Sequence, residues 1–194
     1  MEHINFDKTS LRNTFLEKRN AISPKEKLKW DDLLLIQFQR LSFSDVHTLL
    51  SFWPMPHNNE PNTILFTNYL RHTIPDLEIT YPVSDFDNYT MQAVSINEGT
   101  IYQQNKYHII EPQNGENIEA TSIDLIFVPL LIFDNHGFRV GYGKGFYDRF
   151  LSTCREDILK VGFSYFPPVE NIKDVHKFDL PLDYCITTDS VYEF

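Results

Sequence analysis

Residues 124–151 read DLIFVPLLIFDNHGFRVGYGKGFYDRFL, and this stretch carries the clearest signal of the fold of the whole chain. The segment 126–133 is apolar, is interrupted only by Pro129 and lacks the alternation of a half-exposed strand, so we expect a central parallel strand covered on both faces. Turn residues follow at 134–137, and Gly141, Gly143 and Gly145 then alternate with larger residues before a helical pattern over 146–155. A strand, a glycine loop and a helix in this order are typical of a phosphate-binding site.

The glycine loop suits an anion because glycines let backbone N–H groups turn toward one point and a helix that starts there adds its positive end. Arg139 and Lys144 add full positive charges beside it. The loop is not a P-loop, since no Ser or Thr follows the lysine, and its glycine spacing differs from GxGxxG. The structural alternative is a tight connection that needs positive φ angles. Asp148 and Arg149 crowd the same turn, and this concentration of charge favours the phosphate site.

These residues resemble the long motif of the 5-formyltetrahydrofolate cyclo-ligase family, also called methenyltetrahydrofolate synthetases. The matching positions are Val128, Pro129, Phe133, Asp134, Gly137, Arg139, Gly141 and the run Gly143 to Asp148. Two positions depart from the usual pattern. Leu130 stands where family members usually carry glycine, which bears on strand packing, and Phe146 stands where tyrosine is commoner.

Shorter segments resemble further motifs of this family. Lys8 to Arg12 matches the Lys-x-x-Leu-Arg element that contributes to ATP binding there. The two cations stand one helical turn apart, a repulsive arrangement that fits either an anion held between them or a solvated basic face, and the resemblance favours the anion. Glu60 begins a segment similar to the family's Glu-x-Asp/Glu-Thr element, whose glutamate contacts the folate, and Met55 lies where an apolar contact to the pterin is expected. Glu111 belongs to an Ile-x-Glu-Pro element close to the folate site.

The activity that the resemblance implies is ATP- and Mg²⁺-dependent conversion of 5-formyltetrahydrofolate to 5,10-methenyltetrahydrofolate, with release of ADP and phosphate. Catalytic roles then fall to Arg139, Lys144 and Tyr147. Nucleotide binding falls to Lys8, Arg12, Arg139, Gly141, Tyr142, Gly143, Lys144, Gly145, Phe146 and Tyr147. Folate binding falls to Met55, Glu60, Glu111, Tyr142 and Phe146. Mg²⁺ would be held by Asp148 and by Asp183, which is assigned from its position just before the last strand.

Two other classes of protein stay open at this point. One is an α/β enzyme that uses the loop for a phosphate without ATP, such as a sugar-phosphate isomerase or an acyl transferase. The other is a folate- or nucleotide-binding protein without turnover. Dependence of folate conversion on Mg-ATP separates these alternatives from a cyclo-ligase.

Composition limits the classes of binding partner and the cellular compartment that we expect. The chain has 194 residues and a formal net charge of -10, which argues against a nucleic-acid partner because phosphate backbones need a broad basic surface. Cys154 and Cys185 are too few for a disulfide framework, which fits the reducing cytoplasm. No run reaches the ~18 apolar residues of a membrane span. The family resemblance implies a folate substrate that can carry a polyglutamate tail, and we expect a monomer or homodimer.

The remaining segments complete the expected fold. Helices are expected over 8–20, capped by Thr9 or Ser10, over 24–41 after a capping box at Ser23, and over 63–72. Strands are expected over 46–53, 77–83, 91–96, 126–133, 158–163 and 184–188. Together they predict a single α/β domain spanning residues 1–194, with three layers and a mostly parallel, mixed sheet that has helices on both faces.

Overall fold

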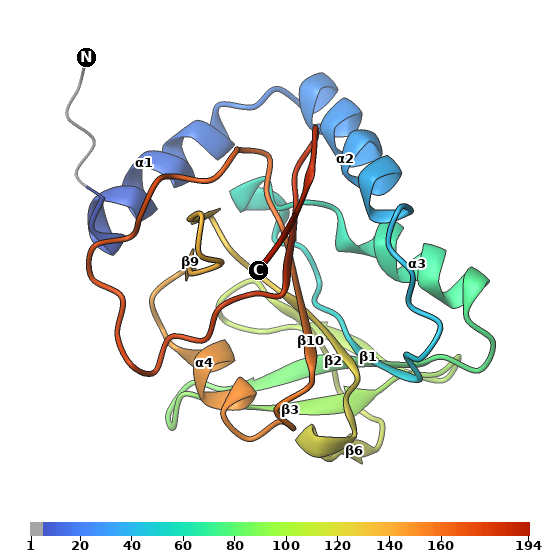
Figure 1. Cartoon of the computed structure of the whole chain (residues 1–194). Coiled ribbons are helices and arrows are strands. Elements are labelled where there is room, and N and C mark those ends of the chain that lie inside the picture. Colours follow the sequence, from blue (N-terminus) through green and yellow to red (C-terminus); the bar gives the residue numbers. More distant parts are fainter. Residues whose placement is uncertain (1–5) are drawn as a thin grey trace.

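The structure, a computed structural model, describes residues 6–194. An eight-stranded sheet with the order β12-β11-β10-β7-β1-β2-β3-β6 forms its middle layer (Figure 1). Neighbouring strands from β11 to β2 run parallel, whereas β12, β3 and β6 pair antiparallel at the two edges. The predicted mixed, mostly parallel sheet is therefore confirmed. Its strands are β1 Thr48–Leu50, β2 Glu78–Asp85, β3 Thr90–Ser95, β6 Asn117–Ile118, β7 Leu125–Val128, β10 Leu159–Phe163, β11 Tyr184–Ile186 and β12 Val191–Glu193.

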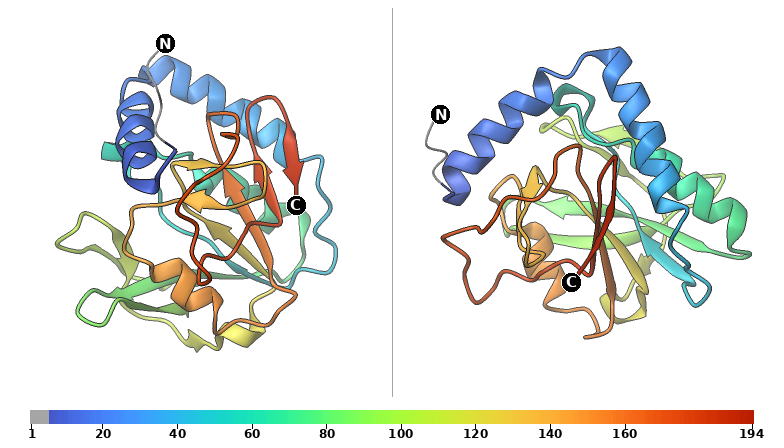
Figure 2. Two further views of the ribbon diagram at one scale, coloured as in Figure 1. Left: turned by 60° about the vertical axis from the view of Figure 1, so that its left-hand side comes forward. Right: turned by 45° about the horizontal axis from the view of Figure 1, so that its top comes forward.

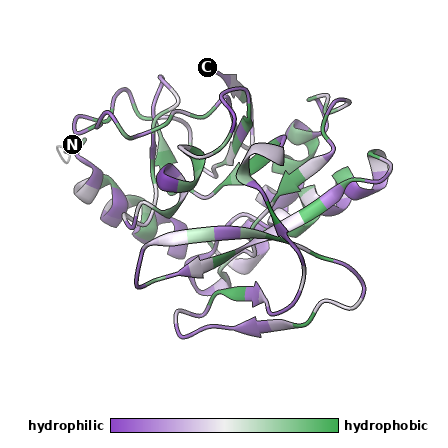
Figure 3. Ribbon diagram, turned by 90° about the horizontal axis from the view of Figure 1, so that it is seen from below, coloured by the Kyte–Doolittle hydropathy of each residue, from purple (hydrophilic) through white to green (hydrophobic). Residues whose placement is uncertain are grey.

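Helices cover both faces of this sheet, as predicted. On one face lie α2 Pro24–Phe38 and α3 Thr63–Thr73, and on the other lies the short α4 Phe146–Leu151 (Figures 1 and 2). The first face buries aromatic side chains, among which Phe66 of α3 stacks on Phe163 of β10 with ring centroids 4.1 Å apart. On the other face, Phe150 and Leu151 of α4 pack with Ile126 of β7. Hydrophilic residues occupy much of the loops around the sheet (Figure 3).

Helix α1 Lys8–Asn20 lies beyond the end of the strands instead of on a face of the sheet. It packs against a small antiparallel pair, β8 Ile132–Phe133 and β9 Arg139–Val140, and against the 3-10 turn η1 Pro56–Asn58. Its apolar stripe, Leu11 and Phe15, is buried there. The cap differs from the prediction, because the Asp7 side chain accepts from the backbone N–H of Ser10 at 2.9 Å.

The predicted eight-residue central strand is shorter than expected. It ends at Val128, and the chain leaves the sheet at Pro129 before residues 132–133 pair with β9. Proline has no N–H to continue a sheet ladder, which explains the break. Leu130 packs over β10, where a Cβ at Gly162 would lie 2.5 Å from the Leu130 Cδ2. The larger residue at position 130 is thus matched by the glycine opposite.

Some elements were not expected from the sequence. They are a hairpin of β4 Tyr102–Gln104 and β5 Ile110–Pro112, and the last strand, β12. A further 3-10 turn, η2 Ala120–Ser122, precedes β7, and α4 ends at Leu151 and not at 155. The predicted capping box of α2 is confirmed by reciprocal bonds between Ser23 and Glu26. No helix within residues 6–194 is long and apolar enough to cross a membrane.

Candidate active site

A cavity of about 560 Å³ opens at the carboxyl ends of the parallel strands, the edge where open α/β sheets bind ligands. Phe52 and Pro129, which follow β1 and β7, form its floor together with β2. Helix α1, the glycine loop, the start of α4 and the segment near Asp179 complete the wall. Thirteen of the predicted site residues line this cavity, namely Lys8, Arg12, Met55, Glu60, Arg139, Gly141, Tyr142, Gly143, Lys144, Gly145, Phe146, Tyr147 and Asp148.

Glu111 and Asp183 do not line the cavity. The buried Glu111 carboxylate accepts from the backbone N–H of Ser84 at 2.8 Å and so holds a strand end that does line it. Asp183 immediately precedes β11 and therefore lies at the amino end of a parallel strand, at the opposite edge of the sheet. Its carboxylate accepts from the Lys160 backbone N–H at 2.6 Å and pairs with the Lys160 ammonium. The structure corrects the placement of both residues.

The carboxylate that does reach the cavity from this part of the chain is Asp179. It pairs with the Lys8 ammonium at 2.5 Å and accepts from the backbone N–H of His176. Sequence reasoning passed over it because Asp179 and Asp183 flank the same Leu-Pro-Leu segment, which has no helical or strand periodicity to show which carboxylate faces inward.

The glycine loop presents unpaired donors to the cavity. Gly143 and Gly145 have φ angles of +82° and +71°, and the N–H groups of residues 142–145 have no backbone or side-chain acceptor within the described chain. Arg12 clamps the loop from α1, since its Nε donates to the Gly141 carbonyl at 2.9 Å. The positive φ angles expected of a tight connection and the unpaired amides expected of an anion site are both present.

Charged side chains surround these amides. Four of them form two ion pairs, and two more are cations without a carboxylate partner in the described chain. Arg139 is largely buried, pairs with Asp148 at 2.8 Å and donates to the Leu180 carbonyl at 2.7 Å. Lys8 pairs with Asp179 in the same way. Within residues 6–194, Arg12 and the exposed Lys144 have no carboxylate partner. This end of the cavity is therefore cationic although the chain as a whole is acidic.

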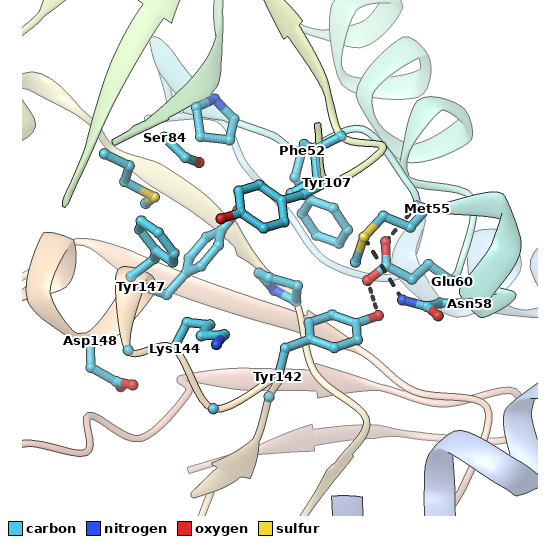
Figure 4. Close-up of a pocket in the computed structure, with 18 of the residues that line it drawn as sticks. Phe52, Met55, Asn58, Glu60, Ser84, Tyr107, Tyr142, Lys144, Tyr147 and Asp148 are labelled. Carbon is cyan, nitrogen blue, oxygen red and sulfur yellow. Dashed lines mark hydrogen bonds between the residues drawn. The ribbon is translucent and has the colours of Figure 1, made fainter. Parts of the chain in front are cut away.

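The other end of the cavity is apolar and largely aromatic. Phe52, Trp53, Met55 and Met91 line it, and Tyr107 packs on Phe86 with ring centroids 3.9 Å apart. Tyr147 lies between the two ends (Figure 4). Burial raises the pKa of Tyr147 far above its ordinary value, so its hydroxyl stays protonated and can donate a hydrogen bond. A flat heterocycle suits such walls.

Glu60 marks the far side of the apolar end, opposite Asp148 (Figure 4). Its carboxylate is buried and accepts from the Met55 backbone N–H at 2.6 Å and from the Tyr142 hydroxyl at 2.5 Å. Burial raises the pKa of Glu60, and the nearby Arg19 guanidinium and these two hydrogen bonds act in the opposite direction. Arg19, for which no site role was assigned from the sequence, donates to the same tyrosine hydroxyl.

The carboxylates fit a metal ion that arrives with phosphates better than a resident one. Among residues 6–194 no three His, Cys, Asp or Glu side chains form a group that could hold a metal. Asp148 and Asp179 are each engaged by one cation, and both line the cationic end. Mg²⁺ commonly takes one or two protein carboxylates while phosphates and water complete its octahedron, and this pair meets that requirement.

Comparisons with known proteins identify the family to which this chain is similar. The model of the 5-formyltetrahydrofolate cyclo-ligase family matches residues 4–183. The 5-formyltetrahydrofolate cyclo-ligase of Mycoplasma genitalium is 30% identical over 189 residues, which cover 92% of this chain and 98% of that protein. The mouse 5-formyltetrahydrofolate cyclo-ligase is 28% identical over 160 residues, covering 78% and 76%.

Solved structures give the same match. The 5,10-methenyltetrahydrofolate synthetase of Aquifex aeolicus has a TM-score of 0.80 at 25% identity, covering 96% of this chain and 92% of that one. The enzyme of the same name from Mycoplasma pneumoniae has a TM-score of 0.73 at 25% identity, covering 93% and 98%.

Proposed function

This chain belongs to the 5-formyltetrahydrofolate cyclo-ligase family, and from that premise we propose how its cavity performs the reaction. The enzyme converts 5-formyltetrahydrofolate to 5,10-methenyltetrahydrofolate at the expense of ATP. The observation that supports this assignment is one cavity with two unlike ends: unpaired amides and free cations at one end, and aromatic walls with a buried carboxylate at the other. A sugar phosphate would need no such aromatic end.

The cationic end takes the triphosphate of ATP. The N–H groups of residues 142–145 bind phosphate oxygens, and Arg12 and Lys144 supply the charge that stabilises the transferring phosphoryl group. Arg139 orients Asp148, to which it is already bonded. Asp148 and Asp179 are the residues that would hold Mg²⁺, which when bound neutralises charge on the phosphate oxygens.

The folate occupies the apolar end, with its pterin directed toward Glu60. A carboxylate offers about four lone-pair sites, and Met55 and Tyr142 use two of them. The remaining two match the adjacent amino and ring N–H groups of a pterin. Phe52, Met55 and Phe146 would contact its faces.

This placement brings the formyl group to the boundary between the two ends. The formyl oxygen attacks the γ-phosphorus, ADP leaves, and an imidoyl phosphate forms on the folate. The neighbouring folate nitrogen then attacks the activated carbon, loses its proton and expels phosphate, which closes the ring. Positioning and charge stabilisation dominate the first step, and the protonated Tyr147 hydroxyl between the ends can hydrogen-bond the reacting oxygen.

The experiment that tests this function follows methenyl-product absorbance with 5-formyltetrahydrofolate, with and without Mg-ATP. We expect turnover only when Mg-ATP is present. Lys144→Ala should lower kcat by about 10²–10³-fold, since loss of one such contact costs about 3–4 kcal/mol of barrier. Lys29→Ala, which removes an exposed lysine from α2, is the matched control and should behave as wild type. No Mg-ATP-dependent turnover, or equal rates in both variants, would contradict the proposal.

Four further properties stay predictions. Cys154 and Cys185 are both free thiols, which fits a cytoplasmic location. A monomer or homodimer, and tolerance of a polyglutamylated substrate, are expected. The single-domain organisation also remains an expectation.

A further inference from the structure

The backbone of Tyr142 lies in the glycine loop at the phosphate end of the cavity, whereas its side chain reaches the folate end. Its backbone lies between Gly141 and Gly143, in the segment with unpaired amides. Its ring crosses the cavity wall, and its hydroxyl donates to Glu60 Oε1 at 2.5 Å (Figure 4). A single residue therefore joins the proposed nucleotide loop to the proposed folate carboxylate.

Arg19 holds the Tyr142 hydroxyl in place through a hydrogen bond of its own. The side chain is almost fully buried, and its guanidinium donates to the Asn58 carbonyl at 2.7 Å, the Leu130 carbonyl at 2.9 Å and the Tyr142 hydroxyl at 2.5 Å. The hydroxyl thus accepts from a cation and donates to a carboxylate, so its hydrogen has one defined direction. Two of the three bonds hold the Arg19 guanidinium to backbone carbonyls, so Arg19 cannot follow the tyrosine. Movement of Tyr142 therefore breaks its bonds to Arg19 and Glu60 together.

The loop that carries Tyr142 is held mainly by side chains. Arg12 contacts the Gly141 carbonyl, and Arg149 donates to the Lys144 carbonyl at 2.9 Å. The amides of residues 142–145 have no protein acceptor in the described chain. An anion on those amides would add the backbone contacts that the loop lacks, and so would hold Tyr142 more firmly in its place.

We propose that Tyr142 is a positioning residue that couples the two ligands: a triphosphate on the glycine loop fixes Tyr142 against Glu60, and so orients the carboxylate that receives the folate. The coupling rests on the proposed function. Linkage requires it to be reciprocal, so bound folate should raise nucleotide affinity by the same factor. The bistable element is the loop 141–145, with Tyr142 either bonded to Glu60 or withdrawn.

Calorimetric binding tests this coupling without turnover. The dissociation constant of 5-formyltetrahydrofolate is measured alone and with a saturating magnesium complex of a non-hydrolysable ATP analogue. For wild type we expect the analogue to tighten folate binding at least about fivefold, the lower end of ordinary coupling. For Tyr142→Phe we expect both ligands to bind, with a coupling ratio close to one. Tyr107→Phe removes a hydroxyl that lines the folate end but is not bonded to the loop, and should keep the wild-type ratio.

The outcomes separate this inference from the proposed function. A wild-type ratio of one, or an unchanged ratio in Tyr142→Phe, would overturn the coupling while leaving the cyclo-ligase function in place. Wild type that binds no folate would overturn the function and the coupling with it. If Tyr142→Phe folds poorly by circular dichroism, Arg19→Lys tests the link from the other side, because its single ammonium cannot keep all three bonds. A ratio that is unchanged there would also overturn the coupling.

Discussion

At Gly143 the backbone conformation and the neighbouring Arg12 side chain both require a residue without a Cβ. Its φ of +82° costs an L-residue about 1–2 kcal/mol, and a Cβ would lie 2.9 Å from Arg12 Nη2. We expect Gly143→Ala to displace Arg12 and to raise the apparent KM for ATP. Gly141→Ala is the matched control, because Gly141 lacks a positive φ and its added Cβ would meet only the Pro129 carbonyl at 3.7 Å. Equal KM values for ATP in the two variants would refute the clamp.

Asp148 and Asp183 were both expected from the sequence to hold Mg²⁺, but only Asp148 lines the cavity. Asp148 lines the cavity, so Asp148→Asn should raise the Mg²⁺ concentration for half-maximal activity at fixed ATP and lower the maximal rate. Asp183→Asn should leave the Mg²⁺ dependence unchanged. It should instead cost about 0.2–1 kcal/mol of unfolding free energy, because the amide loses the ion pair with the Lys160 ammonium while its oxygen can still accept from the Lys160 backbone N–H. A magnesium titration of both variants, with urea melts alongside, decides the assignment. A shifted Mg²⁺ requirement in Asp183→Asn would restore the original assignment.

At the scale of elements, a buried carboxylate ties α2 to the loop before α3 and to the end of β10. Asp31 accepts from the Asn62 backbone N–H at 3.0 Å and from the Tyr165 hydroxyl at 2.6 Å, and it pairs with Lys27 at 2.7 Å. Asp31→Ala leaves these donors without a partner, and each unsatisfied buried group costs about 1–3 kcal/mol. We expect the urea midpoint to fall markedly. Asp32→Ala, at the exposed neighbouring position, should change it little. Similar midpoints for the two variants would contradict this account.

The elements that were predicted correctly are those with a strong local signal. The capping box before α2, the apolar stripe of α1 and the motif around Gly143 are encoded by neighbouring residues. The β4–β5 hairpin was missed because β4 is fully exposed and so lacks apolar alternation. The sequence could not show that Asp183 lies away from the cavity, because that position depends on strand direction, a long-range property.

The site residues show the same division between local and long-range information. The glycine loop and its cations follow one another in the chain, so the motif indicated them together. The bond from Tyr142 to Glu60 joins residues 82 positions apart, and that from Arg19 to Tyr142 joins residues 123 positions apart. Neither has a local pattern, and only the packing of α1 against the loop reveals them.

At the scale of the whole molecule, residues from Lys8 to Asp179 contribute to one cavity. A ligand held there bridges α1, the glycine loop and the segment before β11, and two ion pairs join α1 to Asp179 and β9 to α4 around it. Ligand binding should therefore stabilise the native state as a whole. At 100 times Kd, a ligand specific for the native state adds about 2.7 kcal/mol. For a chain of this size that corresponds to a rise in Tm of roughly 5–10 °C.

The rise in Tm should depend on the residues of the cationic end. A magnesium complex of a non-hydrolysable ATP analogue should raise the Tm of wild type, and should raise that of Lys144→Ala less at the same concentration. Hydrogen exchange should slow together in α1, in residues 139–149 and near Asp179, because one anion contacts all three. Exchange in α2, which packs on the sheet and contributes no cavity residue, reports the global stabilisation alone, and the three ligand-contacting segments should slow by a larger factor than α2. Protection confined to the glycine loop would show that Lys8 and Arg12 do not share the anion. Equal rises in Tm for the two proteins would remove Lys144 from the site.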